Sequence, residues 1–226
     1  MTLPKPYFQD KYVTIYNADC REILPYLEPV DLVLTDIPYN ISQKSAGLRR
    51  LDYGEWDKQK GTEKEWFDAF SMRFKQTAIV FCHKTQFSDL IKWFIEIGAS
   101  TRTLIWHKPN PTIINCEKLY IEATELMAYA KLPNALYKPD YKHNIFEYVS
   151  PVDRQHPTQK PIELLQELIL DTTEPNYSVL DPFFGSGTTL FAAKKLNRYS
   201  IGIEIEEKYC EIAAKRCSQE VMELGV

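Results

Sequence analysis

The chain lacks several features that would place it in other classes of protein. No apolar run approaches the roughly 20 residues that a membrane-spanning helix needs, and the first residues lack the apolar stretch of a secretory signal. The five cysteines include no Cys-x-x-Cys pair, so we expect reduced thiols, no disulfide framework and no metal site. These absences predict a cytoplasmic protein that folds around an ordinary apolar core.

An excess of positive charge is also missing. The 226 residues hold 27 Lys and Arg against 31 Asp and Glu, a formal net charge of −4. The chain is therefore no bulk binder of polyanions, and a nucleic acid would have to meet local groups of cations. The candidates are Lys44, Arg49, Arg50, Lys58 and Lys60, and further along Lys131, Lys138, Lys142, His143 and Arg154. For any one of them taken singly, a solvated surface charge is the better explanation.

Short apolar runs alternate with segments of helical spacing, which is typical of a parallel sheet covered by helices on both faces. The runs predict strands at residues 12–16, 30–34, 77–82, 102–106, 124–130, 178–180 and 199–205. Apolar stripes predict helices at 66–74, at 87–94 ended by Gly98, and at 164–169 with Pro161 at the first helical position. The length favours one domain over residues 1–226, with a long loop at 40–61 and a small segment at 132–155.

The most informative motif is a glycine-rich turn near the end of the chain. It reads Val179-Leu180-Asp181-Pro182-Phe183-Phe184-Gly185-Ser186-Gly187-Thr188-Thr189, between an apolar strand and a helix-like segment at 190–196. Such a turn gathers backbone N–H groups and the positive end of a helix where a nucleoside-bearing cofactor can bind. About twenty residues later, Glu204 closes the next strand, where a carboxylate can accept both ribose hydroxyls.

The motif does not match two other kinds of glycine-rich loop, each because of one residue. A phosphate-binding P-loop needs a lysine where this chain has Thr188, and a dinucleotide fingerprint needs a third glycine where it has Leu190. A glycine turn without any ligand stays open, but Glu204 and the motif described next weigh against it.

The second motif, Leu34-Thr35-Asp36-Ile37-Pro38-Tyr39-Asn40, also follows a hydrophobic strand. An exocyclic amine such as N6 of adenine is a poor nucleophile because its lone pair is delocalised into the ring. Acceptors aimed at its N–H groups favour the pyramidal nitrogen that forms as a methyl group arrives. Asp36 offers a side-chain acceptor and the backbone carbonyl of Ile37 a second one. Pro38 keeps Ile37 extended, and Tyr39 can stack on the base.

Together the two motifs resemble those of DNA amino-methyltransferases, as found in restriction-modification systems. The resemblance rests on Asp181-Pro182-Phe183-x-Gly185-x-Gly187-Thr188 and on Asp36-x-Pro38-Tyr39. The family's catalytic motif usually reads Asp-Pro-Pro-Tyr, so Ile37 is a departure that keeps the carbonyl and adds an N–H. With His156-Pro157-Thr158-Gln159-Lys160-Pro161 just before the glycine turn, the order of motifs is similar to the permuted order called β.

The resemblance implies a single doubly wound, Rossmann-like α/β domain that uses S-adenosylmethionine, with a mostly parallel seven-stranded sheet and one antiparallel edge strand. It implies that the strands of Asp36 and Asp181 are neighbours. Asp19 in Asn17-Ala18-Asp19-Cys20 would lie beside the cofactor adenine, and Thr158 and Lys160 would hold the cofactor carboxylate. The expected cofactor-binding residues are Asp19, Thr158, Lys160, Asp181, Phe183, Gly185, Ser186, Gly187, Thr188, Glu204 and Ile205, and the expected catalytic residues are Asp36, Ile37, Pro38 and Tyr39. Gly54-Glu55-Trp56-Asp57 is similar to a segment that follows the catalytic motif in some members.

The function expected from the resemblance is direct methyl transfer to the exocyclic amine of a base flipped out of double-stranded DNA. Asp at the head of the motif is commoner in adenine-specific relatives and Ser in cytosine-N4 ones, which favours N6 of adenine, with N4 of cytosine as the alternative. A cytosine C5 enzyme would need a nucleophilic Cys, and the chain has no Pro-Cys dipeptide. Methylation of RNA or of a protein amide, and an inactive DNA-binding regulator, are further alternatives.

Recognition of a DNA sequence is expected to fall to the segment 132–155, which is short for that task. We therefore expect a short recognition site, help from the loop 40–61, or a homodimer. The stretch Trp106-His107-Lys108-Pro109-Asn110 could line the base pocket, although a strand end capped by polar groups explains it equally well.

Overall fold

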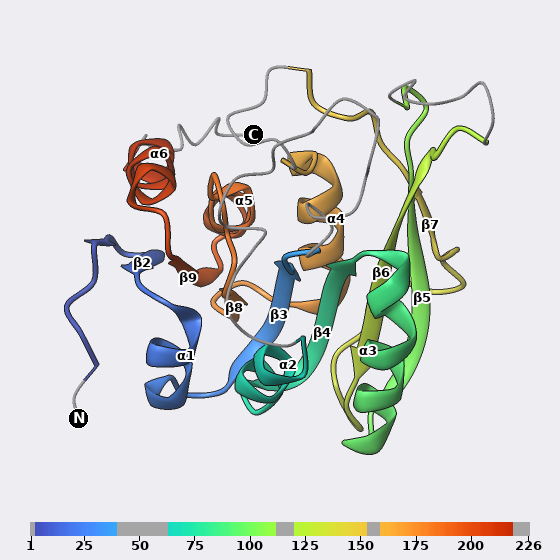
Figure 1. Cartoon of the computed structure of the whole chain (residues 1–226), viewed down its shortest axis with the longest axis horizontal. Helices are drawn as coiled ribbons and strands as arrows, with labels where there is room; N and C mark the ends of the chain where they lie inside the picture. Colours follow the sequence, from blue (N-terminus) through green and yellow to red (C-terminus); the bar gives the residue numbers. More distant parts are fainter. Residues whose placement is uncertain (1–2, 40–62, 112–119, 153–158, 219–226) are drawn as a thin grey trace, which may run out of the picture.

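The computed structural model describes residues 3–39, 63–111, 120–152 and 159–218 (Figure 1). Its strands are β1 (Phe8–Gln9), β2 (Val13–Asn17), β3 (Val30–Asp36), β4 (Phe74–Cys82), β5 (Ser100–His107), β6 (Thr124–Lys131), β7 (Ile145–Glu147), β8 (Ser178–Asp181) and β9 (Tyr199–Glu204). Its helices are α1 (Cys20–Ile23), the 3-10 turn η1 (Leu24–Tyr26), α2 (Glu63–Ser71), α3 (Lys84–Glu96), α4 (Ile162–Thr172), α5 (Thr188–Lys195) and α6 (Glu207–Ser218). All seven predicted strands are confirmed.

The strands form one mixed sheet, which has nine strands within the described ranges, in the order β1-β2-β9-β8-β3-β4-β6-β5-β7. The five strands from β2 to β4 in this order are mutually parallel. The expected seven-stranded sheet with one antiparallel edge strand is wrong in its details. The reversed strand β6 lies inside the sheet between β4 and β5, and β1 and β7 extend the two edges. β5 and β6 follow each other in the chain and pair antiparallel, which requires no helical crossover.

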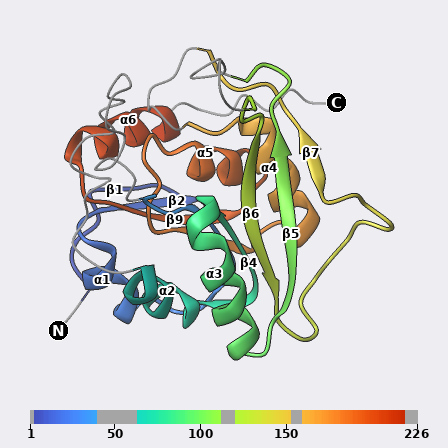
Figure 2. The ribbon, with the colours of Figure 1, turned by 45° about the vertical axis from the view of Figure 1, so that its right-hand side comes forward.

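Helices cover both faces of this sheet, as the alternating pattern predicts. Figure 2 shows α1, α2 and α3 on one face and α4, α5 and α6 on the other. The three apolar stripes supply the buried residues Trp66, Phe67, Phe70, Leu90, Phe94, Leu164, Leu165, Leu168 and Ile169. Burial of each such side chain contributes roughly 1.5–3 kcal/mol, so these stripes hold the layers together.

Several element boundaries differ from the sequence-based prediction. Phe74 begins β4 opposite Val30 of β3 and does not continue the helix, which ends at Ser71. Its position four residues after Phe70 fits a helical stripe by coincidence, and pairing with the neighbouring strand decides its conformation. Pro161 is the N-cap of α4 and not its first residue. Gly98 ends α3 with a φ of 83°, as predicted.

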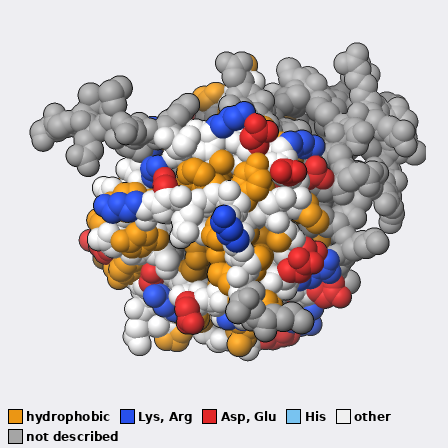
Figure 3. All heavy atoms as spheres, turned by 90° about the vertical axis from the view of Figure 1, so that its left-hand side faces the viewer, with side chains coloured by type: hydrophobic (Ala, Val, Ile, Leu, Met, Phe, Trp, Pro, Cys, Tyr) orange, Lys and Arg blue, Asp and Glu red, His pale blue; other side chains and the backbone are white. Residues whose placement is uncertain are grey.

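The segment 132–155, in which no strand or helix was predicted, contains the short strand β7, which pairs with β5. The loop 40–61 lies outside the described residues. No helix in the described part of the chain has the length and apolar character needed to cross a bilayer. On the face shown in Figure 3, basic and acidic side chains are interspersed, in keeping with the near balance of charges.

Candidate active site

The two sequence motifs meet at the carboxyl edge of the parallel strands. β3 and β8 are neighbours, with Leu32 opposite Val179 and Val33 opposite Leu180. Beyond this pairing, the Thr35 hydroxyl donates a hydrogen bond of 2.7 Å to Asp181 Oδ1. In open α/β sheets ligands bind at this edge, where the strand order changes direction. Segments from the two ends of the sequence therefore build one site.

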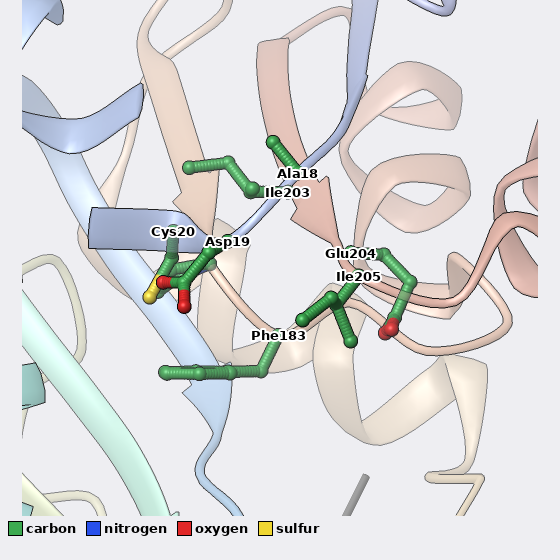
Figure 4. A pocket seen from close by; sticks show the side chains of 8 residues that line it. Ala18, Asp19, Cys20, Phe183, Ile203, Glu204 and Ile205 are labelled. Atoms are coloured by element: carbon green, nitrogen blue, oxygen red, sulfur yellow. The ribbon is translucent and has the colours of Figure 1, made fainter. Parts of the chain in front are cut away.

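A pocket opens where β2, β8 and β9 end. Its lining residues are Ala18, Asp19, Cys20, Pro182, Phe183, Ile203, Glu204 and Ile205. In Figure 4 the carboxylates of Asp19 and Glu204 lie on two sides of the opening, with Ile205 between them and the Phe183 ring beneath. The pocket thus combines apolar surface with two acidic groups, which suits a nucleoside with its flat heterocycle and ribose hydroxyls.

Glu204 is fixed by the backbone around it. Its Oε2 accepts a hydrogen bond from the Gly185 N–H at 3.0 Å and its Oε1 one from the Glu206 N–H at 2.9 Å. The residue is 9% exposed, and burial raises the pKa of its carboxyl to about 7, although these backbone hydrogen bonds act in the opposite direction. The hydrogen bond from Gly185 ties the strand end to the glycine turn.

The glycine turn has the geometry that its sequence predicts. Gly185 and Gly187 have φ angles of 53° and 76°, which disfavour any residue with a side chain. A Cβ at Gly187 would also lie 2.5 Å from Ala213 Cβ of α6. Ser186 Oγ lies 3.4 Å from Gln159 Oε1, and Arg216 donates a hydrogen bond of 3.0 Å to Thr188 Oγ1. The N-terminus of α5 is thus held between the chain before α4 and α6.

On the other side of the pocket, Asp19 caps α1. Its carboxylate accepts a hydrogen bond of 2.6 Å from Arg21, which holds the pKa of Asp19 below its ordinary value. The Phe183 ring is supported by the edge-to-face ring of Trp66 on α2, with centroids 5.5 Å apart. Both lining groups are therefore fixed in place by neighbours.

The catalytic motif is anchored to β4 and α3. The Ile37 N–H, absent from the usual Asp-Pro-Pro-Tyr motif, donates to the Phe81 carbonyl at 3.3 Å and so extends the β3–β4 ladder. The buried Gln86 side chain donates to the Pro38 carbonyl at 2.9 Å. The Tyr39 ring lies beside that of His83, with centroids 6.0 Å apart.

Asp36 ends β3 in a cluster of charged side chains. Its Oδ2 accepts a hydrogen bond of 2.5 Å from Lys160 Nζ, which also lies 3.2 Å from Glu125 Oε2. Its Oδ1 is buried without a well-aligned hydrogen-bond partner among the described residues, and the Tyr39 hydroxyl, which is buried in the same way, acts on this carboxyl and lowers its pKa. Burial raises the pKa of Asp36, with Lys160 opposing and Glu125 adding to the shift. Burial lowers the pKa of Lys160, but the charges of Asp36 and Glu125 outweigh it and raise that pKa overall.

The structure brings together most of the residues expected from the sequence. Four of them line the pocket, namely Asp19, Phe183, Glu204 and Ile205. Asp181 and the turn from Gly185 to Thr188 adjoin it, whereas Lys160 lies against Asp36. Thr158 and the segment from Gly54 to Asp57 lie outside the described residues.

Other candidates have ordinary structural roles. Trp106 is 2% exposed and its indole N–H donates to the Tyr148 carbonyl at 2.8 Å, so its ring belongs to the core. Lys138 and Lys142 pair with carboxylates of α4 and of the segment after it. Of the proposed cations, Lys44, Arg49, Arg50, Lys58, Lys60 and Arg154 lie outside the described residues.

Sequence reasoning missed two side chains that hold the site, Gln86 and Glu125. Glu125 is the only charged residue between Thr124 and Ala130, an otherwise apolar strand, and that exception could have marked it. The sequence around Gln86 holds no comparable signal, because a glutamine in the first turn of a helix is common.

Comparisons with known proteins place the chain among enzymes. A family model for N6 and N4 methyltransferases, described as DNA methylase, matches residues 30–215. The Type II methyltransferase M2.LlaDCHI of Lactococcus lactis subsp. cremoris is 26% identical over 251 residues, covering 96% of this chain and 93% of that protein.

Solved structures of such enzymes have the same fold. The crystal structure of the M1.HpyAVI–SAM complex superposes with a TM-score of 0.72 at 30% identity, covering 90% of this chain and 99% of that one. The PvuII DNA methyltransferase, titled cytosine-N4-specific, has a TM-score of 0.74 at 19% identity, covering 97% and 91%, which is a likeness of fold alone.

Proposed function

The chain belongs to the DNA methylase family of N6 and N4 methyltransferases, and from this premise we propose that it methylates N6 of adenine in a base flipped out of double-stranded DNA. Membership makes it a DNA methyltransferase, and its cofactor is S-adenosylmethionine. The observation that carries the proposal is Asp36 Oδ1, a buried acceptor without a well-aligned donor among the described residues, on the strand next to that of Asp181. A buried acceptor of this kind is suited to an N–H donor from a substrate.

The pocket fits the cofactor in its chemistry. Glu204 would accept the ribose hydroxyls, Asp19 would lie at the adenine, and Phe183 and Ile205 would cover the apolar faces. Gly185, Ser186, Gly187 and Thr188 would offer backbone close to the ligand. Thr158 is proposed for the carboxylate of the cofactor. Lys160 was expected there too, but its ammonium lies against Asp36 and Glu125, and we propose that it acts on Asp36 instead. When bound, S-adenosylmethionine supplies a methyl group on a positively charged sulfur.

The residues of the catalytic motif would act on the amine. Asp36 Oδ1 and the Ile37 carbonyl would accept its two N–H groups and favour a pyramidal nitrogen whose lone pair can attack. The amine would take the methyl group from the cofactor sulfur, which would keep the electron pair of the broken bond, and the methylated nitrogen would release one proton to solvent. Pro38 and the hydrogen bond from Gln86 would hold this backbone in place, and Tyr39 would stack on the flipped base.

Recognition of the target sequence is proposed for the segment 132–155, with help from 40–61. Large side chains in its described part are exposed: Tyr137, Tyr141, Val149 and Val152. A homodimer would supply a second copy of this surface. Sedimentation with and without DNA tests the dimer, and a monomer under both conditions would contradict it.

The proposal is tested by tritiated-methyl transfer to DNA, RNA and protein, followed by nucleoside analysis. We expect label in DNA as N6-methyladenine. Asp36→Ala should lower kcat at least about 100-fold, in the range seen when a preorganised transition-state hydrogen bond is removed. Binding of S-adenosylhomocysteine, followed by calorimetry, should largely remain.

Asp68→Ala on α2 is the matched control, because it removes an exposed carboxylate paired with Lys64 and should keep wild-type activity. A wild-type rate in Asp36→Ala would contradict the catalytic assignment. Label in N4-methylcytosine would replace adenine by the alternative base, and label in RNA or protein, or none at all, would overturn the proposed substrate.

A further inference from the structure

Glu125 lies at the carboxyl edge of the parallel strands, where the catalytic motif is, because β6 runs antiparallel to its neighbours β4 and β5. The parallel strands end at this edge, but β6 begins there, with Leu126 opposite Cys82 of β4 and Glu125 opposite Trp106 of β5. A residue at the start of β6 therefore lies beside residues that end β3 and β4.

Four side chains of alternating charge form a row from this point to Asp36. Lys108 Nζ lies 2.5 Å from Glu125 Oε1, Lys160 Nζ lies 3.2 Å from Glu125 Oε2, and Lys160 Nζ lies 2.5 Å from Asp36 Oδ2. The Lys160 side chain is only 6% exposed, and the Asp36 and Glu125 side chains are 22% exposed. Lys160 Nζ also lies 5.1 Å from the centroid of the Phe81 ring. The ammonium is thus shared by two carboxylates in a poorly hydrated place.

Sharing the ammonium bears directly on how Asp36 can act. An ammonium held by Asp36 alone would neutralise the carboxylate and weaken both of its oxygens as acceptors, because charge interactions are strong where water is scarce. When a second carboxylate pairs with the same ammonium, the ammonium interacts less strongly with Asp36. Lys108 in turn holds Glu125 in its place.

We propose that Glu125 is a positioning residue for methyl transfer, which shares Lys160 with Asp36 so that Asp36 Oδ1 stays available to the amine of the base. This inference rests on the proposed function, because the amine is the partner of Asp36 Oδ1. Glu125 acts through Lys160 and Asp36 and touches neither the base nor the cofactor in this scheme.

The pH dependence of kcat separates this role from a purely structural one. The charged and titratable groups that interact with Asp36 are Lys160, Glu125, Tyr39, Asp181 and Cys82. Behind them, Lys108 pairs with Glu125 and the His83 ring lies beside that of Tyr39. The negative charge of Glu125 raises the pKa of Asp36, so its removal lowers that pKa. Since charged Asp36 is the active form, the acid limb of the kcat profile should move to lower pH.

The test uses Glu125→Gln and Glu125→Asp in the full chain, with methyl transfer to DNA measured from pH 5 to 9. In Glu125→Gln we expect kcat above the acid limb to fall about tenfold, which corresponds to about 1.4 kcal/mol in the barrier, with an acid limb at lower pH and an unchanged KM for DNA. Glu125→Asp keeps the charge and should keep the acid limb of the wild type even if its stability falls. Glu211→Gln, which breaks an exposed pair with Lys215 on α6, is the matched control.

An unchanged kcat and acid limb in Glu125→Gln would overturn the inference. So would a reduced kcat without any movement of the limb, because that pattern belongs to a structural role. If Glu125→Gln does not fold, a displaced acid limb in Glu125→Asp would overturn the inference and a wild-type limb would support it. Failure of the proposed function is recognised separately, because the wild type would then transfer no methyl group to DNA.

Discussion

At the scale of single residues, burial governs the carboxyl groups of the site. Burial raises the pKa of Asp181 to about 6 and that of Glu204 to about 7. For Asp181, hydrogen bonds from Thr189 and Thr35 oppose the shift. These carboxyl groups therefore change their charge much closer to neutral pH than a solvated carboxyl group does.

Glu204 should make the stability of the fold depend on pH. Between its ordinary pKa of 4.5 and its folded value of about 7, the unfolded chain loses this proton first. Folding is therefore favoured at low pH, and this contribution is lost as the pH rises through about 7. In Glu204→Gln, the free energy of unfolding relative to wild type should rise between pH 5 and pH 8 by up to about 3 kcal/mol.

Urea unfolding at several pH values measures this difference. Glu28→Gln, a change on the exposed surface, is the control and should follow the wild type at every pH. A constant difference between Glu204→Gln and wild type would show that the carboxyl is ionised in the folded protein throughout this range.

Ile37 shows how one residue can depart from a family motif and still fit. Its side chain is 3% exposed, and its N–H, which a proline would lack, donates a hydrogen bond to the Phe81 carbonyl. A proline there would have no N–H for this bond. The departure thus replaces the stiffness of a proline ring by one more hydrogen bond to the neighbouring strand.

At the scale of elements, the close packing of β9 against α5 determines the shape of the glycine turn. Gly202 lies between Ile15 of β2 and Asp181 of β8. A Cβ at this position would lie 2.5 Å from Phe184 Cδ1 and 2.6 Å from Leu190 Cδ1. Phe184 belongs to the turn itself. If it moves to make room for a methyl group at position 202, its neighbours Phe183 and Gly185 must move with it.

Gly202→Ala should therefore destabilise the protein by about 1–3 kcal/mol through overpacking. It should also weaken the binding of S-adenosylhomocysteine, because Phe184 and its neighbours must shift. Thermal unfolding and calorimetry measure the two effects. Gly98→Ala is the comparison, since a Cβ there meets no atom within 4 Å and only the backbone strain of a positive φ acts. Unchanged stability and affinity in Gly202→Ala would mean that the two side chains can move freely.

At the scale of the whole molecule, one sheet carries both halves of the site. The cofactor strands β8 and β9 and the catalytic strand β3 are hydrogen-bonded neighbours, and cores lie on both faces of the sheet. We therefore expect one cooperative unit over the chain, in which a ligand of the pocket stabilises the catalytic half as well.

S-adenosylhomocysteine at about 100 times its dissociation constant should stabilise the fold by about 2.7 kcal/mol. For a chain of this size, this corresponds to a rise in Tm of about 5–10 °C. The shift should remain in Asp36→Ala and largely vanish in Glu204→Ala. Differential scanning calorimetry measures it, and two separate transitions, of which only one moves, would contradict the single unit.

Much of this molecule can be predicted from its sequence because the information is local. The seven apolar runs became strands, the glycines of the turn adopted positive φ where needed, and both motifs fell at strand ends. Errors arose where a local pattern was compatible with two outcomes, as for Phe74, or where too few residues carried a pattern, as for β1 and β7.

Local patterns in the chain were enough to predict seven of the strands, the helices α2, α3, α4 and α5, and the chemistry of the two motifs, since each depends on neighbours a few positions away. They did not predict the helices α1 and α6. The reversed direction of β6 between β4 and β5, and the charged cluster of Glu125, Lys160 and Asp36, are visible in the folded molecule alone. These features arise from pairing between distant segments. Strand order and the meeting of buried charges depend on how the whole sheet packs, and no spacing along the chain encodes them.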